Sequence, residues 1–150
     1  MKHMFAGIAL AALAAIPFSA QAQFAKAEDA VKYRQSSLSV MATHFSRIGA
    51  VVKGEKPYDK TAVEADAAIV EMMAKLPWSA FPAGSNVANS KAKPEIWSEQ
   101  DKFKAAADKT QAEVSKLSAA AKAGDLNAIK TAFGAVGQSC KACHDNFRNK

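Results

Sequence analysis

The stretch DLNAIKTAFGAVGQSCKACH, residues 125–144, decides the fold of this chain. Its apolar positions recur every three or four residues: Leu126, Ile129, Phe133, Val136, Cys140 and Cys143. This spacing places them on one face of an α-helix, and we expect that face to be buried. Asp125 is a residue type that caps helix N-termini. Gly124 tolerates the left-handed conformation that ends a preceding helix. The sequence therefore predicts two helices joined by a one-glycine turn.

A long helix is also predicted at the start of the chain, from about Ala27 to Val52. Its apolar stripe again steps by three and four: Val31, Leu38, Met41, Phe45, Ile48 and Val52. Arg34 lies in phase with this stripe, so an arginine occupies an inward position. The segment from Gly54 to Pro57 ends the helix.

Two more helices are predicted between these. One begins near Thr61, because Thr61 with Glu64 has the form of a capping box, and it stops at Leu76-Pro77. The other begins at Ser98 and ends at the glycine of the one-glycine turn. Its inward positions are Phe103, Ala107, Thr110, Val114, Leu117 and Ala121.

The expected fold class is all-α, an antiparallel up-down-up-down four-helix bundle with a long loop between the second and third helices. The prolines, glycine and asparagines of residues 76–97 exclude a continuous helix there. That loop also contains large apolar side chains, so we expect it to pack on the bundle: Trp78, Phe81, Ile96 and Trp97.

The first 22 residues resemble a cleaved signal peptide. A short basic start precedes an uncharged apolar run from Met4 to Ile16, and the segment Ala20-Gln21-Ala22 has the form of a cleavage site. The run is too short to span a membrane. We therefore expect an exported domain of residues 23–150 with no membrane anchor after cleavage. Its 19 basic and 14 acidic residues give a net charge of +5. The dispersed lysines predict no nucleic-acid binding, although they favour an acidic redox partner.

The chemistry-bearing motif is Cys140-Lys141-Ala142-Cys143-His144, which has the CxxCH form of c-type haem attachment. Two thiols must reach the two vinyl groups of one porphyrin, and the adjacent imidazole must then serve as axial ligand to the iron. On a helix, Cys140, Cys143 and His144 share one face. The motif therefore predicts one covalently attached haem c per chain.

Other interpretations of the cysteine pair fit less well. A redox dithiol usually lies between a strand and a helix, and no strand is predicted. A zinc site needs four ligands, yet only His44 remains in the chain after residue 22 beyond this cluster. A structural disulfide is disfavoured because Cys140 and Cys143 share one helix face.

The sixth coordination position of the iron decides the function. Only six residues follow His144, so a second ligand must come from upstream: Met41, His44, Met72 or Met73. Core packing explains the methionines equally well. The inward Arg34 calls for an anion, which a haem propionate would supply, and the adjacent Gln35 offers a second hydrogen bond.

These residues together resemble cytochrome c′, the class II c-type cytochromes. The resemblance covers essentially the whole chain after residue 22. It rests on the run from Asp29 to Gln35, the Leu76-Pro77-Trp78 turn with Phe81, the segment from Pro94 to Trp97, and the run from Ala132 to His144.

The resemblance implies a periplasmic homodimer with a five-coordinate, high-spin haem. It places Leu38 over the distal face, where its side chain cannot bind iron. It makes Arg34 and Gln35 contacts of the propionates, puts Phe81 beside the cofactor and puts Arg148 near the proximal face. The loop of residues 83–93 departs most from the family, and its role is left open.

Two functions remain at this point. One is a haem protein that binds nitric oxide and carbon monoxide at an open iron. The other is a low-spin, six-coordinate electron carrier with Met41 as the sixth ligand. A third interpretation, a structural bundle with paired cysteines, requires that no haem be attached. We expect no enzymatic activity, since no acid–base pair converges beside the predicted iron.

Overall fold

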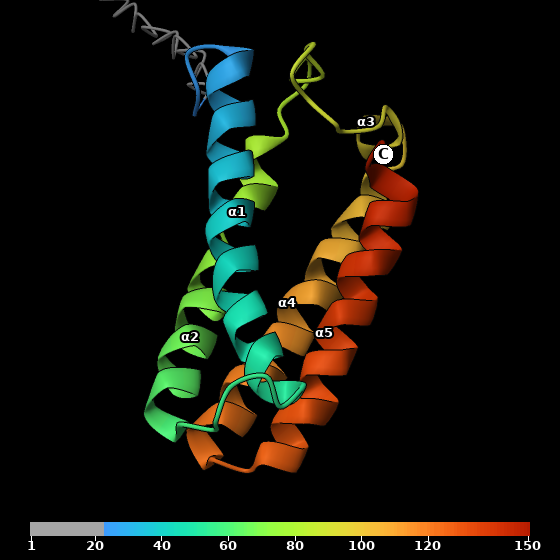
Figure 1. Ribbon diagram of the computed structural model, residues 1–150. Helices are drawn as coiled ribbons and strands as arrows, with labels where there is room; N and C mark the ends of the chain where they lie inside the picture. The colour runs from blue at the N-terminus through green and yellow to red at the C-terminus, as the bar shows by residue number, and fades with distance from the viewer. Residues whose placement is uncertain (1–22) are drawn as a thin grey trace, which may run out of the picture.

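The computed structural model describes residues 23–150, so the expected signal peptide lies outside the described residues. The elements are α1 (Ala27–Val52), α2 (Lys60–Met73), a 3₁₀ turn η1 (Pro77–Ala80), α3 (Glu95–Ser98), α4 (Gln100–Ala123) and α5 (Leu126–Phe147). The four long helices form the expected all-α bundle (Figure 1). None of the helices described combines the length and hydropathy needed to cross a bilayer.

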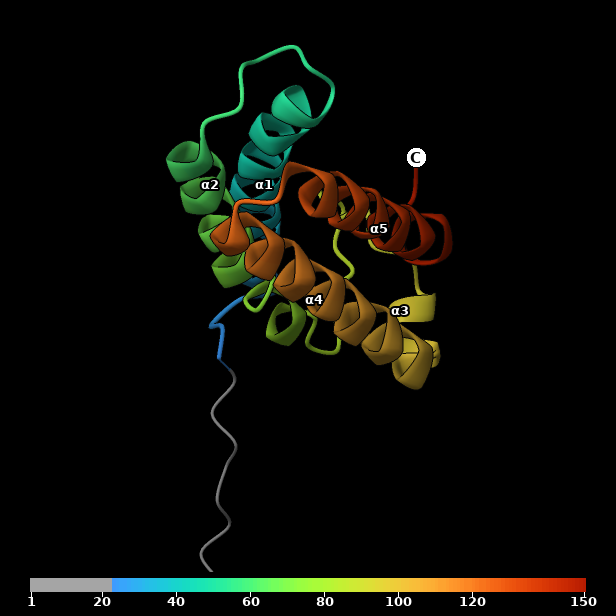
Figure 2. The ribbon, with the colours of Figure 1, turned by 90° about the horizontal axis from the view of Figure 1, so that it is seen from below.

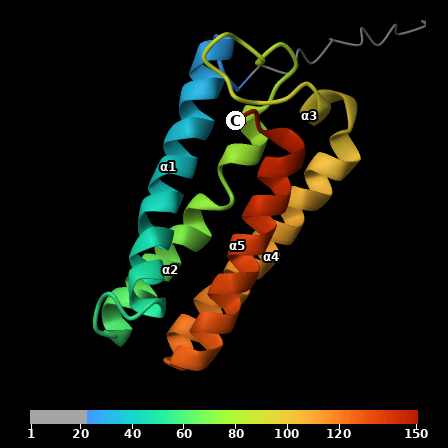
Figure 3. The same ribbon diagram turned by 45° about the vertical axis from the view of Figure 1, so that its right-hand side comes forward.

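Successive long helices run in opposite directions. In Figure 1, α1 descends, α2 rises, the connecting segment crosses the top, α4 descends and α5 rises. Seen along the axis, α1 and α2 form one pair and α4 and α5 the other (Figure 2). The start of α1 and the end of α5 therefore lie at the same end of the bundle, together with the long loop (Figure 3).

The caps of the last two helices are as predicted. Gly124 has φ +79°, the left-handed conformation that ends α4. The Asp125 carboxylate accepts hydrogen bonds from the backbone N–H groups of Asn127 at 2.9 Å and Ala128 at 3.2 Å. These bonds satisfy donors that a helix start leaves unpaired.

The predicted starts of the two middle helices were wrong by one or a few residues. Asp59 caps α2, because its carboxylate accepts from the Ala62 N–H at 3.2 Å, whereas Thr61 lies inside the helix. The helix predicted to begin at Ser98 begins instead at Gln100, and a separate short helix precedes it. Pro94 starts the short α3, and Glu99, with φ −123° and ψ 50°, breaks the helical path before α4.

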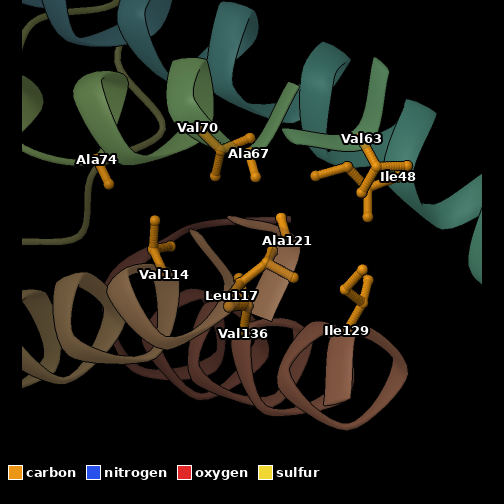
Figure 4. Close-up of a cluster of buried hydrophobic side chains, with 10 residues drawn as sticks. All are labelled: Ile48, Val63, Ala67, Val70, Ala74, Val114, Leu117, Ala121, Ile129 and Val136. Atoms are coloured by element: carbon orange, nitrogen blue, oxygen red, sulfur yellow. The ribbon is translucent and has the colours of Figure 1, made fainter. Parts of the chain in front are cut away.

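The core fills the end of the bundle where α1 passes into α2. Ten buried side chains meet there from all four long helices (Figure 4): Ile48, Val63, Ala67, Val70, Ala74, Val114, Leu117, Ala121, Ile129 and Val136. The Phe45 and Phe133 rings stack beside them with centroids 4.2 Å apart. Gly49 makes room for this stack, since a Cβ there would lie 3.0 Å from Phe133. This end of the bundle is thus closed by close packing.

The long loop packs on the opposite end, as its apolar content predicts. The Trp97 indole N–H lies 3.0 Å from the carbonyl oxygens of both Phe81 and Pro82. Ala92 pairs with Arg148 in an isolated β-bridge, and the Lys93 N–H donates to the Phe147 carbonyl at 3.0 Å. Because Arg34 near the start of α1 also donates to Ser85 and Ser90 of the loop, the loop connects the start of α1 to the end of α5.

Candidate functional site

A cavity of about 250 Å³ opens between α1, the long loop, α4 and α5. Its wall contains all nine residues that the sequence analysis selected: Arg34, Gln35, Leu38, Met41, Phe81, Cys140, Cys143, His144 and Arg148. A second hollow of about 660 Å³ between α1 and α5 shares part of this wall. The residues common to both are Leu38, Met41, Cys140, His144 and Arg148.

The two cysteines reach the cavity from one face of α5. Both are partly buried free thiols. Burial raises the pKa of Cys140 above its ordinary value. Burial, with a smaller contribution from Cys140, raises the pKa of Cys143 to about 11. Both sulfurs are therefore neutral thiols near neutral pH, unlike the low-pKa thiol of a redox dithiol.

His144 follows Cys143 directly and lines both hollows. Partial burial lowers the pKa of its imidazole, and the nearby Arg148 charge lowers it further. The ring is thus neutral near neutral pH, which is the form that ligates a metal. Among residues 23–150, no three His, Cys, Asp or Glu side chains are grouped so that they could hold a bare metal ion.

Arg34 lies on the opposite side of the cavity and is only 3% exposed. Its Nη1 donates to the Ala80 carbonyl at 2.7 Å and to Ser85 Oγ at 2.9 Å. Its Nη2 donates to the Ser85 carbonyl and to Ser90 Oγ, both at 2.8 Å. The guanidinium also lies 4.4 Å from the centroid of the Phe81 ring. Four neutral acceptors therefore hold this buried cation, and Nε is the one donor left for an anion.

The remaining upstream candidates for a sixth ligand are not equivalent. Leu38 and Met41 lie in the cavity wall on α1, facing the side contributed by α5. His44 Nδ1 lies 2.6 Å from the Asp66 carboxylate, so this histidine is engaged between α1 and α2. Met72 is 61% exposed on α2. Of the four candidates, only Met41 lines the cavity.

Sequence reasoning selected no site residue from α4 and none from the loop beyond Phe81. The structure adds Phe103 and Thr110 from α4, and Ser90 and Lys91 from the loop. Thr110 had a recognisable signal, because it is the one polar residue on the inward stripe of its helix. The Thr110 hydroxyl donates to the Ala106 carbonyl at 3.0 Å. No comparable periodicity points to the loop residues.

The cavity wall combines a group of polar and cationic side chains with a larger apolar surface. Its polar and cationic groups gather where α1 begins and α5 ends: Arg34, Gln35, Ser90, Lys91 and Arg148. Its apolar wall is largely aromatic and aliphatic: Leu38, Met41, Trp78, Phe81, Ile96, Phe103 and Phe147. Such a wall fits a flat apolar ring with carboxylates on one edge, and the two thiols and the imidazole fit the attachment chemistry of haem.

Comparison with known proteins agrees with this geometry. A family model described as Cytochrome C' matches residues 29–148. Cytochrome c′ from Alcaligenes xylosoxydans xylosoxydans is 52% identical over 128 residues, covering 85% of this chain and 99% of the relative. Cytochrome c′ from Rubrivivax gelatinosus is 45% identical over 129 residues, covering 85% of this chain and all of the relative.

Solved structures show the same architecture. The crystal structure of the Rubrivivax gelatinosus protein matches with a TM-score of 0.82 at 44% identity, over 85% of this chain and 100% of that one. A nitric oxide complex of a leucine-to-alanine variant of cytochrome c′ from Alcaligenes xylosoxidans matches with a TM-score of 0.81 at 50% identity, over 85% and 99%. The chain therefore belongs to the cytochrome c′ family and carries one covalently attached c-type haem.

Proposed function

We propose that this chain is an exported cytochrome c′ that leaves the sixth position of its haem iron open for nitric oxide or carbon monoxide. Cys140 and Cys143 form the two thioethers, and His144 is the axial ligand. The observation that supports the proposal is that these three groups and Leu38 line the same cavity. When bound, the haem supplies an iron that exchanges one electron and takes up diatomic ligands.

Leu38 restricts the distal side of the cavity. Its aliphatic side chain has no lone pair for the iron, so it fills space without ligating. The solved nitric oxide complex of a relative with a leucine replaced by alanine supports ligand binding in this fold. The Thr110 hydroxyl is engaged with the Ala106 carbonyl. The apolar lining therefore offers a bound ligand little hydrogen bonding, which favours nitric oxide and carbon monoxide over dioxygen.

Electron transfer is the second part of the proposed function. An acidic redox partner fits the net charge of +5 on residues 23–150. The competing assignment is a six-coordinate, low-spin carrier in which Met41 binds the iron. Met41 lines the same cavity, so its sulfur is the one credible competitor. The two assignments give different absorption spectra in the ferrous state.

The attachment is tested by expressing Cys140→Ser, Cys143→Ser and the double variant in a host that exports and matures c-type cytochromes. The unmodified protein should retain its haem through denaturation and gel electrophoresis. Each single variant should retain less haem, and the double variant none. Ser139→Ala, beside Cys140 on the same helix, is the matched control and should keep the haem. Haem that stays attached in the double variant would contradict the proposal.

Export, assembly and lack of enzymatic activity complete the proposal. We expect residues 1–22 to be removed in the periplasm, so N-terminal sequencing of the mature protein should begin at Gln23. We expect a homodimer, which light scattering would detect. We expect the protein to bind diatomic ligands and transfer electrons rather than to turn over a substrate.

A further inference from the structure

The loop of residues 83–93 reaches the polar end of the cavity with two side chains that the proposed function does not use. Ser90 and Lys91 both line the cavity wall beside Arg34, Gln35 and Arg148. Backbone bonds on either side hold them there. The Ser90 N–H donates to the Val87 carbonyl at 2.8 Å, and the Lys91 carbonyl accepts from the Asn149 N–H at 2.8 Å.

Counting donors shows which of these groups have hydrogen-bonding capacity left. Ser90 Oγ accepts from Arg34 Nη2 at 2.8 Å and from the Ala92 N–H at 3.1 Å. Both of its lone pairs are then engaged, and its own O–H is left to donate into the cavity. Arg34 keeps only Nε, since its other four donors are used. Gln35 keeps one of its two amide hydrogens, because the other is donated to the Asn89 carbonyl at 3.0 Å.

The charges around this end leave an uncompensated positive excess. Within residues 23–150, neither Lys91 nor Arg148 has a carboxylate within ion-pair distance. Lys93, two residues along the loop, is instead directed to the Asp145 carbonyl at 2.8 Å. Two cations and a set of free donors thus surround one end of a cavity that accepts a ligand with two carboxylates.

We infer that Ser90 and Lys91 bind the haem propionates, with the Ser90 hydroxyl donating a hydrogen bond and the Lys91 ammonium providing the opposing charge. This inference rests on the proposed attachment of haem at Cys140 and Cys143. It makes the loop part of the cofactor site rather than a passive cover. Arg34 then has two roles, because the guanidinium that donates to Ser90 Oγ also keeps its Nε–H free for an anion.

The test uses the exported holoprotein with the variants Lys91→Met and Ser90→Ala. Lys93→Met is the matched control, since it removes the same charge from the same loop at a side chain directed elsewhere. A positive charge beside a propionate favours the ferrous state. Lys91→Met should therefore shift the equilibrium between ferrous and ferric protein toward ferric by about threefold at low ionic strength, the size expected for an exposed charge pair. Ser90→Ala should shift it in the same direction by less, and Lys93→Met should leave it nearly unchanged.

A crystal structure of the holoprotein supplies a second measurement. It should place Lys91 Nζ and Ser90 Oγ within about 3.2 Å of propionate oxygens. Equal shifts in Lys91→Met and Lys93→Met, or propionates contacted only from α1 and α5, would overturn the inference. Haem that survives denaturation in every variant shows that attachment itself is intact. Unmodified protein that carries no attached haem would instead contradict the proposed function.

Discussion

Replacing Arg34 with methionine tests how the long loop is held on the bundle. Methionine keeps most of the apolar stem but removes all the donors of the guanidinium. The Ala80 and Ser85 carbonyl oxygens then lose their partners in a region where Arg34 is 3% exposed and Ser85 fully buried. The hydroxyl groups of Ser85 and Ser90 lose a donor as well, although hydroxyls can rotate to other acceptors.

The expected loss of stability follows from these contacts. Each buried acceptor left without a partner costs about 1–3 kcal/mol. Two carbonyls at the middle of that range account for about 4 kcal/mol, and smaller losses from the hydroxyls and from the stacking on Phe81 add to this. For a domain of this size, such a loss corresponds to a fall in Tm of about 10 °C or more.

Chemical denaturation of the holoprotein measures the loss, and hydrogen exchange locates it. The amides of Lys93 and Asn149, which bond between the loop and the end of the chain to Phe147 and Lys91, should lose protection. Core amides of α4 and α5 should keep theirs at low denaturant. Arg47→Met is the matched control, because Arg47 is 61% exposed on the same helix and its loss should change stability by about 0.5 kcal/mol or less. A loss below 1 kcal/mol for Arg34→Met, or unchanged loop protection, would refute this account of the loop.

Three further changes have defined outcomes. Gly49→Ala should destabilise the protein by up to about 2 kcal/mol, because the new methyl would lie 3.0 Å from Phe133 and its overpacking cost of about 1–3 kcal/mol exceeds the gain of about 0.5–1 kcal/mol from alanine in a helix. Gly134→Ala, with open space at its Cβ, should be neutral or slightly stabilising in the same denaturation assay. Leu38→Ala should speed nitric oxide binding by about tenfold in stopped-flow measurements, which corresponds to lowering the activation free energy by about 1.36 kcal/mol. An unchanged rate would show that Leu38 does not limit access to the iron. The pKa of Cys143 is raised to about 11, so the buried neutral thiol stabilises the folded apoprotein fully below about pH 9. The free energy of unfolding of apoprotein should then fall as the pH rises toward 11, whereas holoprotein, whose Cys143 is a thioether, should show no such fall.

Local sequence patterns predicted the helices well where periodicity and caps agreed. The turn at Gly124 and Asp125 combines a left-handed glycine with a side-chain cap. Each of these residues bonds to backbone groups no more than four residues away, so the local sequence was enough to predict the turn. The start of α2 was misplaced because Asp59 and Thr61 both suit an N-cap position. The backbone there is extended at Asp59, so the helix begins immediately after it.

Contacts between residues far apart in the chain could not be predicted from the sequence. Arg34 was recognised as an inward cation, and an anion was expected as its partner. Its actual acceptors in the chain lie 46 to 56 residues away in a loop without regular structure. No periodicity relates Ser85 or Ser90 to the first helix, so only the folded chain shows that they share one hydrogen-bond network. The same limitation left Lys91 out of the predicted site.

The absorption spectrum of the exported, ferrous protein distinguishes an open sixth position of the iron from one occupied by Met41. We expect a five-coordinate, high-spin spectrum without added ligand, because a leucine at position 38 cannot bind the iron. Added nitric oxide or carbon monoxide should then change the spectrum without displacing a protein ligand from the distal side. A low-spin, six-coordinate ferrous spectrum before any ligand is added, abolished by Met41→Leu, would contradict the open site and establish Met41 as the sixth ligand.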